Sequence, residues 1–323
     1  MRVMTDLTLI IIVMKEENMQ TEEKEYAELL CDFMFKRLFG SIANKDVLIW
    51  FLNMIIDDAK IEDVRFINTE NLGLTKQDRK CIFDISCTCE DGSNLIIEMQ
   101  KGYQKHFKKR AVYYTTYPIN AQGKEARELY IKEHQCKNDG VEFKWDYDLK
   151  PVTVVAFLDF KFPHSESWPE NRYHSSYRLR EDSTNEIMTD VLRFVFLELG
   201  RFKKGINEIK TPFEKFMYLL RHMHEMTSVP KVFRTPEFER LFILAEIGNF
   251  TPKEYEQYQK SLKVMSDYYN IIDNAVEEAE KRGREEGVKE NKLETAKKMK
   301  ERGIADDIRS ECTGLTIETI QSL

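Results

Sequence analysis

The stretch CIFDISCTCEDGSNLIIEMQ, residues 81–100, decides the predicted fold, because it contains two strands joined by a turn. In residues 81–89 apolar and polar side chains alternate, which is typical of a half-buried strand. The polar, glycine-containing segment 90–94 follows as a turn, and residues 95–100 form a second, more apolar run. This pattern predicts a β-hairpin whose second strand lies in the core.

Three polar side chains of this hairpin are predicted to share one face. Glu98 and Gln100 point the same way, because strand side chains repeat every second residue. With a turn of three or five residues, we expect the numbers of two residues that face each other across the hairpin to add up to 184. Asp84 then lies opposite Gln100 and diagonal to Glu98. A two-residue turn would place Asp84 on the other face. Diagonal neighbours are roughly 7–8 Å apart at the backbone, and two carboxylates at that spacing can share one Mg²⁺ ion.

An ordinary hairpin with solvent-facing acids is the alternative interpretation of Asp84 and Glu98. Glu98, however, is flanked by Ile96, Ile97 and Met99 on a strand that we expect in the core. An unpaired charge there costs several kcal/mol unless something compensates it. A bound cation would do so, which favours a metal site.

Composition limits the function classes. The chain has 323 residues, of which 33% are charged, and a net charge of −7, which argues against broad electrostatic wrapping of nucleic acid but leaves room for a local basic path. The six cysteines include no Cys-x-x-Cys pair, so we expect reduced thiols and a cytoplasmic location. The apolar run at residues 7–14 is too short to span a bilayer, so we expect no membrane partner.

A basic run directly follows the hairpin. Residues 101–110, KGYQKHFKKR, carry five formal positive charges and no acid, and tyrosines follow them. Basic side chains interleaved with aromatic rings can hold phosphates and stack on bases, although a solvated helix face is an equally good interpretation. The predicted DNA contacts are Lys105, Lys108, Lys109, Arg110, Tyr113 and Tyr114.

The remaining pattern predicts helices around further strands. We expect a first helix over residues 21–38, strands near 64–68, 151–160, 172–180 and 192–199, and a polar insertion at 123–150. Three Thr-Pro pairs, at 211, 235 and 251, mark later helix starts. The highly charged segment 277–300 predicts a helix that is either solvated or self-associating.

The hairpin acids also carry a family resemblance. Asp84, thirteen intervening residues and then Glu98-x-Gln100 resemble the PD-(D/E)XK nuclease superfamily, with Phe83 in place of Pro and Gln100 in place of Lys. More closely, the chain resembles the recombination-promoting nuclease and putative transposase family (Rpn), whose members often carry this Gln. Residues 32–40, DFMFKRLFG, match its opening signature, and Arg110 with the following tyrosine pair matches its Arg-x-x-Tyr-Tyr pattern.

The resemblance implies an α/β fold with a restriction-endonuclease-like core, in which a mixed central sheet is flanked by helices, over residues 21–202. A helical region at 203–274 and a charged helix with a small helix-turn-helix-like tail at 275–323 would follow. The resemblance also implies a metal-dependent endonuclease that cuts DNA without strong sequence preference, with a role in recombination or as a mobile-element remnant.

Roles for individual residues follow from the same resemblance. Asp84 and Glu98 would hold Mg²⁺ or another divalent cation such as Mn²⁺, and Gln100 would orient the attacking water. Asp32 and Lys36 would approach the metal centre from the first helix, although they would equally be the charged rim of an ordinary amphipathic helix.

Two other functions fit the same residues. One is a nucleic-acid-binding module of this fold that no longer cleaves. The other is a self-assembling, partner-binding protein that forms a homo-oligomer through its charged C-terminal helix.

Overall fold

The computed structural model describes residues 24–56, 60–67, 84–134 and 143–323. Contacts divide the chain into two units, Met1–Gln259 and Lys260–Leu323. This division does not coincide with the predicted boundaries after residues 202 and 274, because helices α5 (Pro212–His222) and α6 (Pro236–Ala245) belong to the same unit as the sheet.

A mixed six-stranded sheet is the centre of the first unit. Its strands are β1 (Val64–Phe66), β2 (Ile85–Cys89), β3 (Asn94–Gln100), β4 (Val152–Leu158), β5 (His174–Arg178) and β6 (Leu192–Glu198). The spatial order is β1-β2-β3-β4-β6-β5, with β3, β4 and β6 parallel and the other pairs antiparallel. The predicted α/β fold with a mixed sheet is confirmed.

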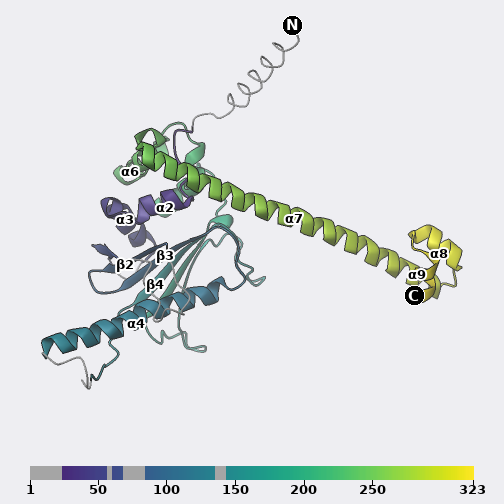
Figure 1. Ribbon diagram of the computed structural model, residues 1–323, viewed down its shortest axis with the longest axis horizontal. Helices are drawn as coiled ribbons and strands as arrows, with labels where there is room; N and C mark the ends of the chain where they lie inside the picture. Colours follow the sequence, from purple (N-terminus) through teal and green to yellow (C-terminus); the bar gives the residue numbers. More distant parts are fainter. Residues whose placement is uncertain (1–23, 57–59, 68–83, 135–142) are drawn as a thin grey trace, which may run out of the picture. The chain divides into compact units, whose positions relative to one another are not determined.

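Helices cover both faces of the sheet (Figure 1). Helices α2 (Asp32–Phe39) and α3 (Lys45–Ile55) lie on one face, where the ring of Phe157 packs at 5.2 Å from Phe35 and 5.0 Å from Phe51 between centroids. Helix α4 (Phe107–Glu133) covers the other face, which includes the even-numbered positions of β3, β4 and β6. Glu98 and Gln100 share this second face, because side chains alternate along a strand.

The first helix is shorter than predicted. It begins at Asp32, whereas the sequence predicts a start near Thr21, which lies outside the described residues. The preceding chain pairs with the end of α6 instead: Tyr26 forms a β-bridge with Glu246, and the Ala27 N–H donates to Ala245 O at 2.8 Å. Tertiary pairing here overrides the local helical pattern.

The predicted polar insertion at 123–150 contains helical and irregular parts. Helix α4 continues through its internal Pro118 to Glu133, so the insertion begins as an ordered helix. Part of the remainder, residues 143–150, has no regular secondary structure and runs into β4.

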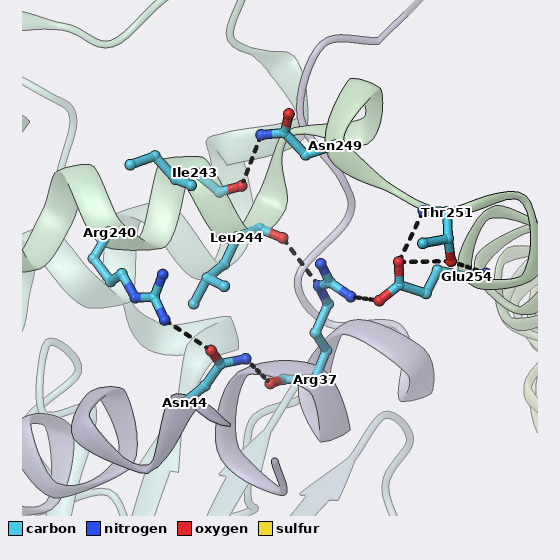
Figure 2. Close-up of polar contacts among 8 residues, drawn as sticks. All are labelled: Arg37, Asn44, Arg240, Ile243, Leu244, Asn249, Thr251 and Glu254. Carbon is cyan, nitrogen blue, oxygen red and sulfur yellow. Dashed lines mark hydrogen bonds and ion pairs between the residues drawn. The ribbon is translucent and has the colours of Figure 1, made fainter. Parts of the chain in front are cut away.

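Arg37 of α2 attaches to the end of α6 and to the start of the following helix (Figure 2). Its Nε donates to Leu244 O at 3.3 Å, and its guanidinium pairs with Glu254 near the start of helix α7 (Pro252–Glu301). Glu254 also accepts the Thr251 N–H at 2.8 Å in a capping box. All three Thr-Pro pairs precede helices, as predicted.

The second unit contains the later part of α7 with helices α8 (Asp306–Thr313) and α9 (Ile317–Ser322). Ala296 and Ile320 are buried in it, and Gly314 ends α8 in the left-handed conformation, with φ 65°. Residues 271–290 of α7 are exposed throughout. Short 3-10 turns occupy Ile42–Asn44, Leu199–Arg201, Met223–Glu225, Lys231–Phe233 and Ile247–Asn249.

Within the described ranges, no single helix is long and apolar enough to cross a bilayer. Helix α2 and the segment Ile42–Ile55, with a bend of 65° between them, are long and apolar enough only as a pair.

Candidate active site

The β2–β3 hairpin places the two predicted metal ligands closer together than the sequence suggested. Its pairs run from Ile85↔Ile97 to Thr88↔Asn94, so facing numbers sum to 182 rather than 184. The turn consists of residues 90–92, closed by the Cys89 N–H donating to Ser93 O at 2.8 Å. Gly92 takes φ +85°, which a three-residue hairpin turn requires.

Extending this register by one residue puts Asp84 opposite Glu98, not opposite Gln100. The predicted pairing is therefore wrong by two residues. Side chains alternate with a period of two, so a shift of two keeps all three side chains on the face that α4 covers.

Asp84 lies immediately before β2 and is fixed by the neighbouring strand. Its Oδ2 accepts the Met99 N–H at 2.7 Å. Burial raises the pKa of the Asp84 carboxyl, while this hydrogen bond and the charges of Lys36 and Arg110 act in the opposite direction.

Glu98 is the more deeply buried acid, with only 5% of its surface exposed. Burial, followed by the negative charge of Asp84, raises its pKa to about 8, and Arg110 and Lys36 partly oppose this increase. Within the described part of the chain its buried Oε1 has no hydrogen-bond partner. Unsatisfied buried acceptors of this kind are uncommon in folded proteins and typically mark a functional position.

This arrangement fits a hard divalent cation. Mg²⁺ is usually held by one or two carboxylates and retains several waters. Asp84 and Glu98 supply two carboxylates, and one Glu98 oxygen has no partner among the residues that the structure describes. Cation binding requires the ionised carboxylate, so a metal would oppose the effect of burial on the pKa of Glu98. In the ranges 24–56, 60–67, 84–134 and 143–323, no group of three or more His, Cys, Asp or Glu is arranged to hold a metal.

Helix α2 contributes charge to the two acids. Lys36 and Asp32 form an ion pair along one face of the helix, with Nζ and Oδ1 2.9 Å apart. Lys36 lowers the pKa of both Asp84 and Glu98, and Asp32 raises that of Asp84. The structure thus brings both predicted helix residues within electrostatic reach of the acid pair.

Gln100 is linked to the start of α4. Its Nε2 donates to Gly102 O at 3.2 Å, and its Oε1 accepts a hydrogen bond from Nη2 of Arg110. A second guanidinium nitrogen, Nη1, donates to Gln104 Oε1. Arg110, which the sequence predicts as a DNA contact, thus hydrogen-bonds to a predicted site residue.

The remaining predicted DNA contacts fall into two groups. Lys105, Lys108 and Lys109 are exposed around the first turn of α4, and Tyr113 is 46% exposed. Tyr114, in contrast, is only 8% exposed and packs in the core between α4 and the sheet, so its ring is not available to stack on a base.

Sequence reasoning gave no role to Glu198, which occupies the end of β6. The register Gln100↔Leu158↔Glu198 puts it on the same sheet face as Gln100. It is 1% exposed, accepts the Phe162 N–H at 2.7 Å and the Arg201 Nε–H at 2.8 Å, and lies 2.7 Å from His164 Nε2. The sequence signal that could have identified Glu198 was its even-numbered position at the end of a predicted strand, which places it on the same face as Gln100. Its partners could not be found from spacing.

A comparison with protein families identifies a match for this chain. The family described as PD-(D/E)XK nuclease family transposase matches residues 29–275, which include α2, the whole sheet and the Asp84–Glu98 pair. A search of curated proteins and a search of solved structures each found no match. The match covers well over half of the 323 residues. The chain therefore belongs to the PD-(D/E)XK nuclease family transposases.

Proposed function

We propose that this protein is a divalent-metal-dependent endonuclease that hydrolyses DNA phosphodiester bonds with little sequence preference. Nuclease-type chemistry follows from the family. The observation that carries the finer proposal is the Asp84–Glu98 pair, in which the buried Glu98 has a high pKa and one oxygen that no donor among the described residues reaches.

The two acids would hold Mg²⁺ or Mn²⁺, the class of cation that suits carboxylate ligands. Such a cation, when bound, lowers the pKa of a water and stabilises charge on the phosphate. Asp84 would be a ligand with a fixed orientation, because the Met99 N–H donates to its Oδ2 at 2.7 Å and restrains the carboxylate. Burial beneath α4 limits bulk water around Glu98.

Gln100 would orient the attacking water. An amide side chain has two N–H donors and two acceptor lone pairs. The bonds with Gly102 and Arg110 use one of each, so one donor and one acceptor remain for a water or a phosphate oxygen.

DNA would approach along the first turn of α4. Lys105, Lys108 and Lys109 are exposed there, next in the chain to the strand that carries the site. Lysines neutralise backbone phosphates without reading bases, which supports low sequence preference. Tyr113 offers a partly exposed ring for stacking.

A DNA-binding protein of the same fold that does not cleave is the competing function. Its supporting observation is Gln100 itself, because an amide lacks the positive charge of the lysine in the superfamily pattern.

Supercoiled-plasmid cleavage separates the two functions. We expect nicking or linearisation by the wild type with Mg²⁺ or Mn²⁺, none with EDTA, and a loss of at least roughly 10²-fold in Asp84→Asn and Glu98→Gln, since even outer-sphere changes typically reduce metal affinity 10–100-fold. Glu125→Gln is the matched control, an exposed acid on α4. Cleavage that persists equally in both site variants would refute the nuclease proposal, and metal-independent DNA binding without cleavage would favour the competing function.

A further inference from the structure

Gln100 is neutral, so a positive charge at the site has to come from another side chain. Three basic side chains lie near the site: Lys36, Lys101 and Arg110. Lys101 is partly buried among Glu28, Asp32 and Asp159, and burial lowers its pKa. Its neighbours are therefore acids outside the Asp84–Glu98 pair. Lys36 acts on both site acids, but its side chain is half exposed and pairs with Asp32.

Arg110 differs from these lysines because it contacts the motif itself. Its Nη2 donates directly to Gln100 Oε1, so a full positive charge is one hydrogen bond away from the residue that takes the lysine position. Of the two cations acting on Glu98, it has the larger effect. Lys36 contacts Asp32 instead of Gln100.

The guanidinium is also held in a fixed orientation. It lies over the rings of Phe107 and Tyr114, with Cζ at 5.1 Å and 5.5 Å from their centroids, and Nη1 donates to Gln104. Both rings are buried in the core beneath α4. A planar guanidinium with these contacts keeps a more fixed orientation than the ammonium group of a flexible lysine side chain would.

The Nε–H of the guanidinium is a further donor, besides the two N–H groups that bind Gln100 and Gln104. Among the residues that the structure describes, the buried Nε of Arg110 has no hydrogen-bond partner, which parallels the unpaired Oε1 of Glu98. The two residues attract each other electrostatically. Among the described residues, the site thus has an unpaired oxygen on Glu98 and an unpaired donor on Arg110.

We propose that Arg110 is a positioning residue that replaces, from helix α4, the charge of the missing lysine: it fixes the Gln100 amide and supplies the positive field next to the acid pair. The inference rests on the proposed nuclease function. It assigns a role to the Arg of the Arg-x-x-Tyr-Tyr pattern. Tyr114 of the same pattern contacts the guanidinium with the face of its ring.

The test exchanges the charge between the two positions. The variants are Arg110→Gln, Arg110→Lys, Gln100→Lys and the double variant Gln100→Lys/Arg110→Gln, with Lys124→Gln as the control, an exposed basic residue of the same helix. We expect Arg110→Gln to lose roughly 10²-fold in kcat, in line with removal of one preorganised charge-stabilising group, with KM for DNA little changed. Arg110→Lys should retain part of the activity, and the double variant should recover at least about tenfold.

A purely structural role would give a different result. If Arg110 only anchored the start of α4, Gln100→Lys would not rescue Arg110→Gln, because the lysine restores charge but not that anchor. Equal activity of Arg110→Gln and wild type, or loss without rescue in the double variant, would overturn the inference. An increase in KM alone would assign Arg110 to DNA binding and overturn it as well.

A second measurement does not depend on cleavage. The side-chain NH₂ protons of Gln100 should give two dispersed NMR signals at the same positions in the wild type and in Lys124→Gln, and these signals should shift in Arg110→Gln, because the amide oxygen loses its donor. Unchanged Gln100 signals in Arg110→Gln would refute the contact. If wild type fails to cut DNA while these signals respond, the nuclease proposal fails and the Arg110–Gln100 contact stands without it.

Discussion

Replacing Glu98 by Gln should stabilise the metal-free protein while abolishing its proposed activity. Glu98 has a pKa of about 8 in the folded protein, chiefly because of burial and then because of Asp84, against an ordinary value of 4.5. In the unfolded chain it ionises freely above pH 4.5, so ionisation favours unfolding. Gln has nearly the same shape and no charge, and therefore removes this effect.

The magnitude follows from the difference between the two pKa values. Below pH 4.5 the carboxyl is protonated in both states and has no effect on stability. As the pH rises from about 4.5 to about 8, only the unfolded chain loses the proton, so the folded state is progressively destabilised. A shift of this size corresponds to roughly 3 kcal/mol at pH 7 and to roughly 5 kcal/mol above pH 8.

Urea unfolding in EDTA at pH 4.5 and pH 7 measures this effect. The three tryptophans, Trp50, Trp145 and Trp168, all lie in the first unit, so their fluorescence reports on the unit that contains the site. We expect Glu98→Gln to match wild type at the lower pH and to have a higher free energy of unfolding at pH 7, whereas Glu125→Gln should match wild type at both. A Glu98→Gln variant that is equally or less stable at pH 7 would refute the claim that Glu98 is held against its ionisation.

Arg37→Ala should lower the free energy of unfolding of the first unit by about 1–3 kcal/mol, because a partly buried ion pair and a bond to the end of α6 are lost together; an unchanged urea midpoint would contradict the role seen in Figure 2. Changing Lys105, Lys108 and Lys109 together to Gln should reduce the salt dependence of DNA binding by about 2.7 in log–log slope, and titrations at several salt concentrations that give equal slopes would exclude these lysines from the interface. A chain ending at Asn274 should lose self-association if the charged part of α7 mediates it, and unchanged sedimentation would remove that prediction.

Those parts of the fold that depend on local chemistry could be predicted from the sequence. Each Thr-Pro start precedes a helix, because Pro at the first helical position acts within one turn, and Thr211 and Thr251 also cap their helices. The buried strand β4 was visible as a β-branched run. The start of α2 was not predictable, since Tyr26 and Ala27 pair with residues more than two hundred positions later.

The site shows the same division between local and distant information. The shared face of Asp84 and Glu98 followed from the two-residue period of strands, which survives an error of two in register. The contact from Arg110 to Gln100 depends on how α4 leaves the strand, and the burial of Tyr114 depends on what α4 packs against. Neither relation is contained in the local pattern, so the sequence alone could not show that Arg110 contacts Gln100 or that the Tyr114 ring is buried.

The three-residue turn at residues 90–92 limits how relatives of this chain can diverge. An insertion or deletion of one residue that shifted β2 by one position against β3 would turn Asp84 away from Glu98, and every apolar side chain of β2 would change faces with it. Shifts by two residues avoid this inversion. In active relatives, the length of this hairpin should therefore differ by an even number of residues. A difference of an odd number should occur together with a β-bulge that accommodates the extra residue.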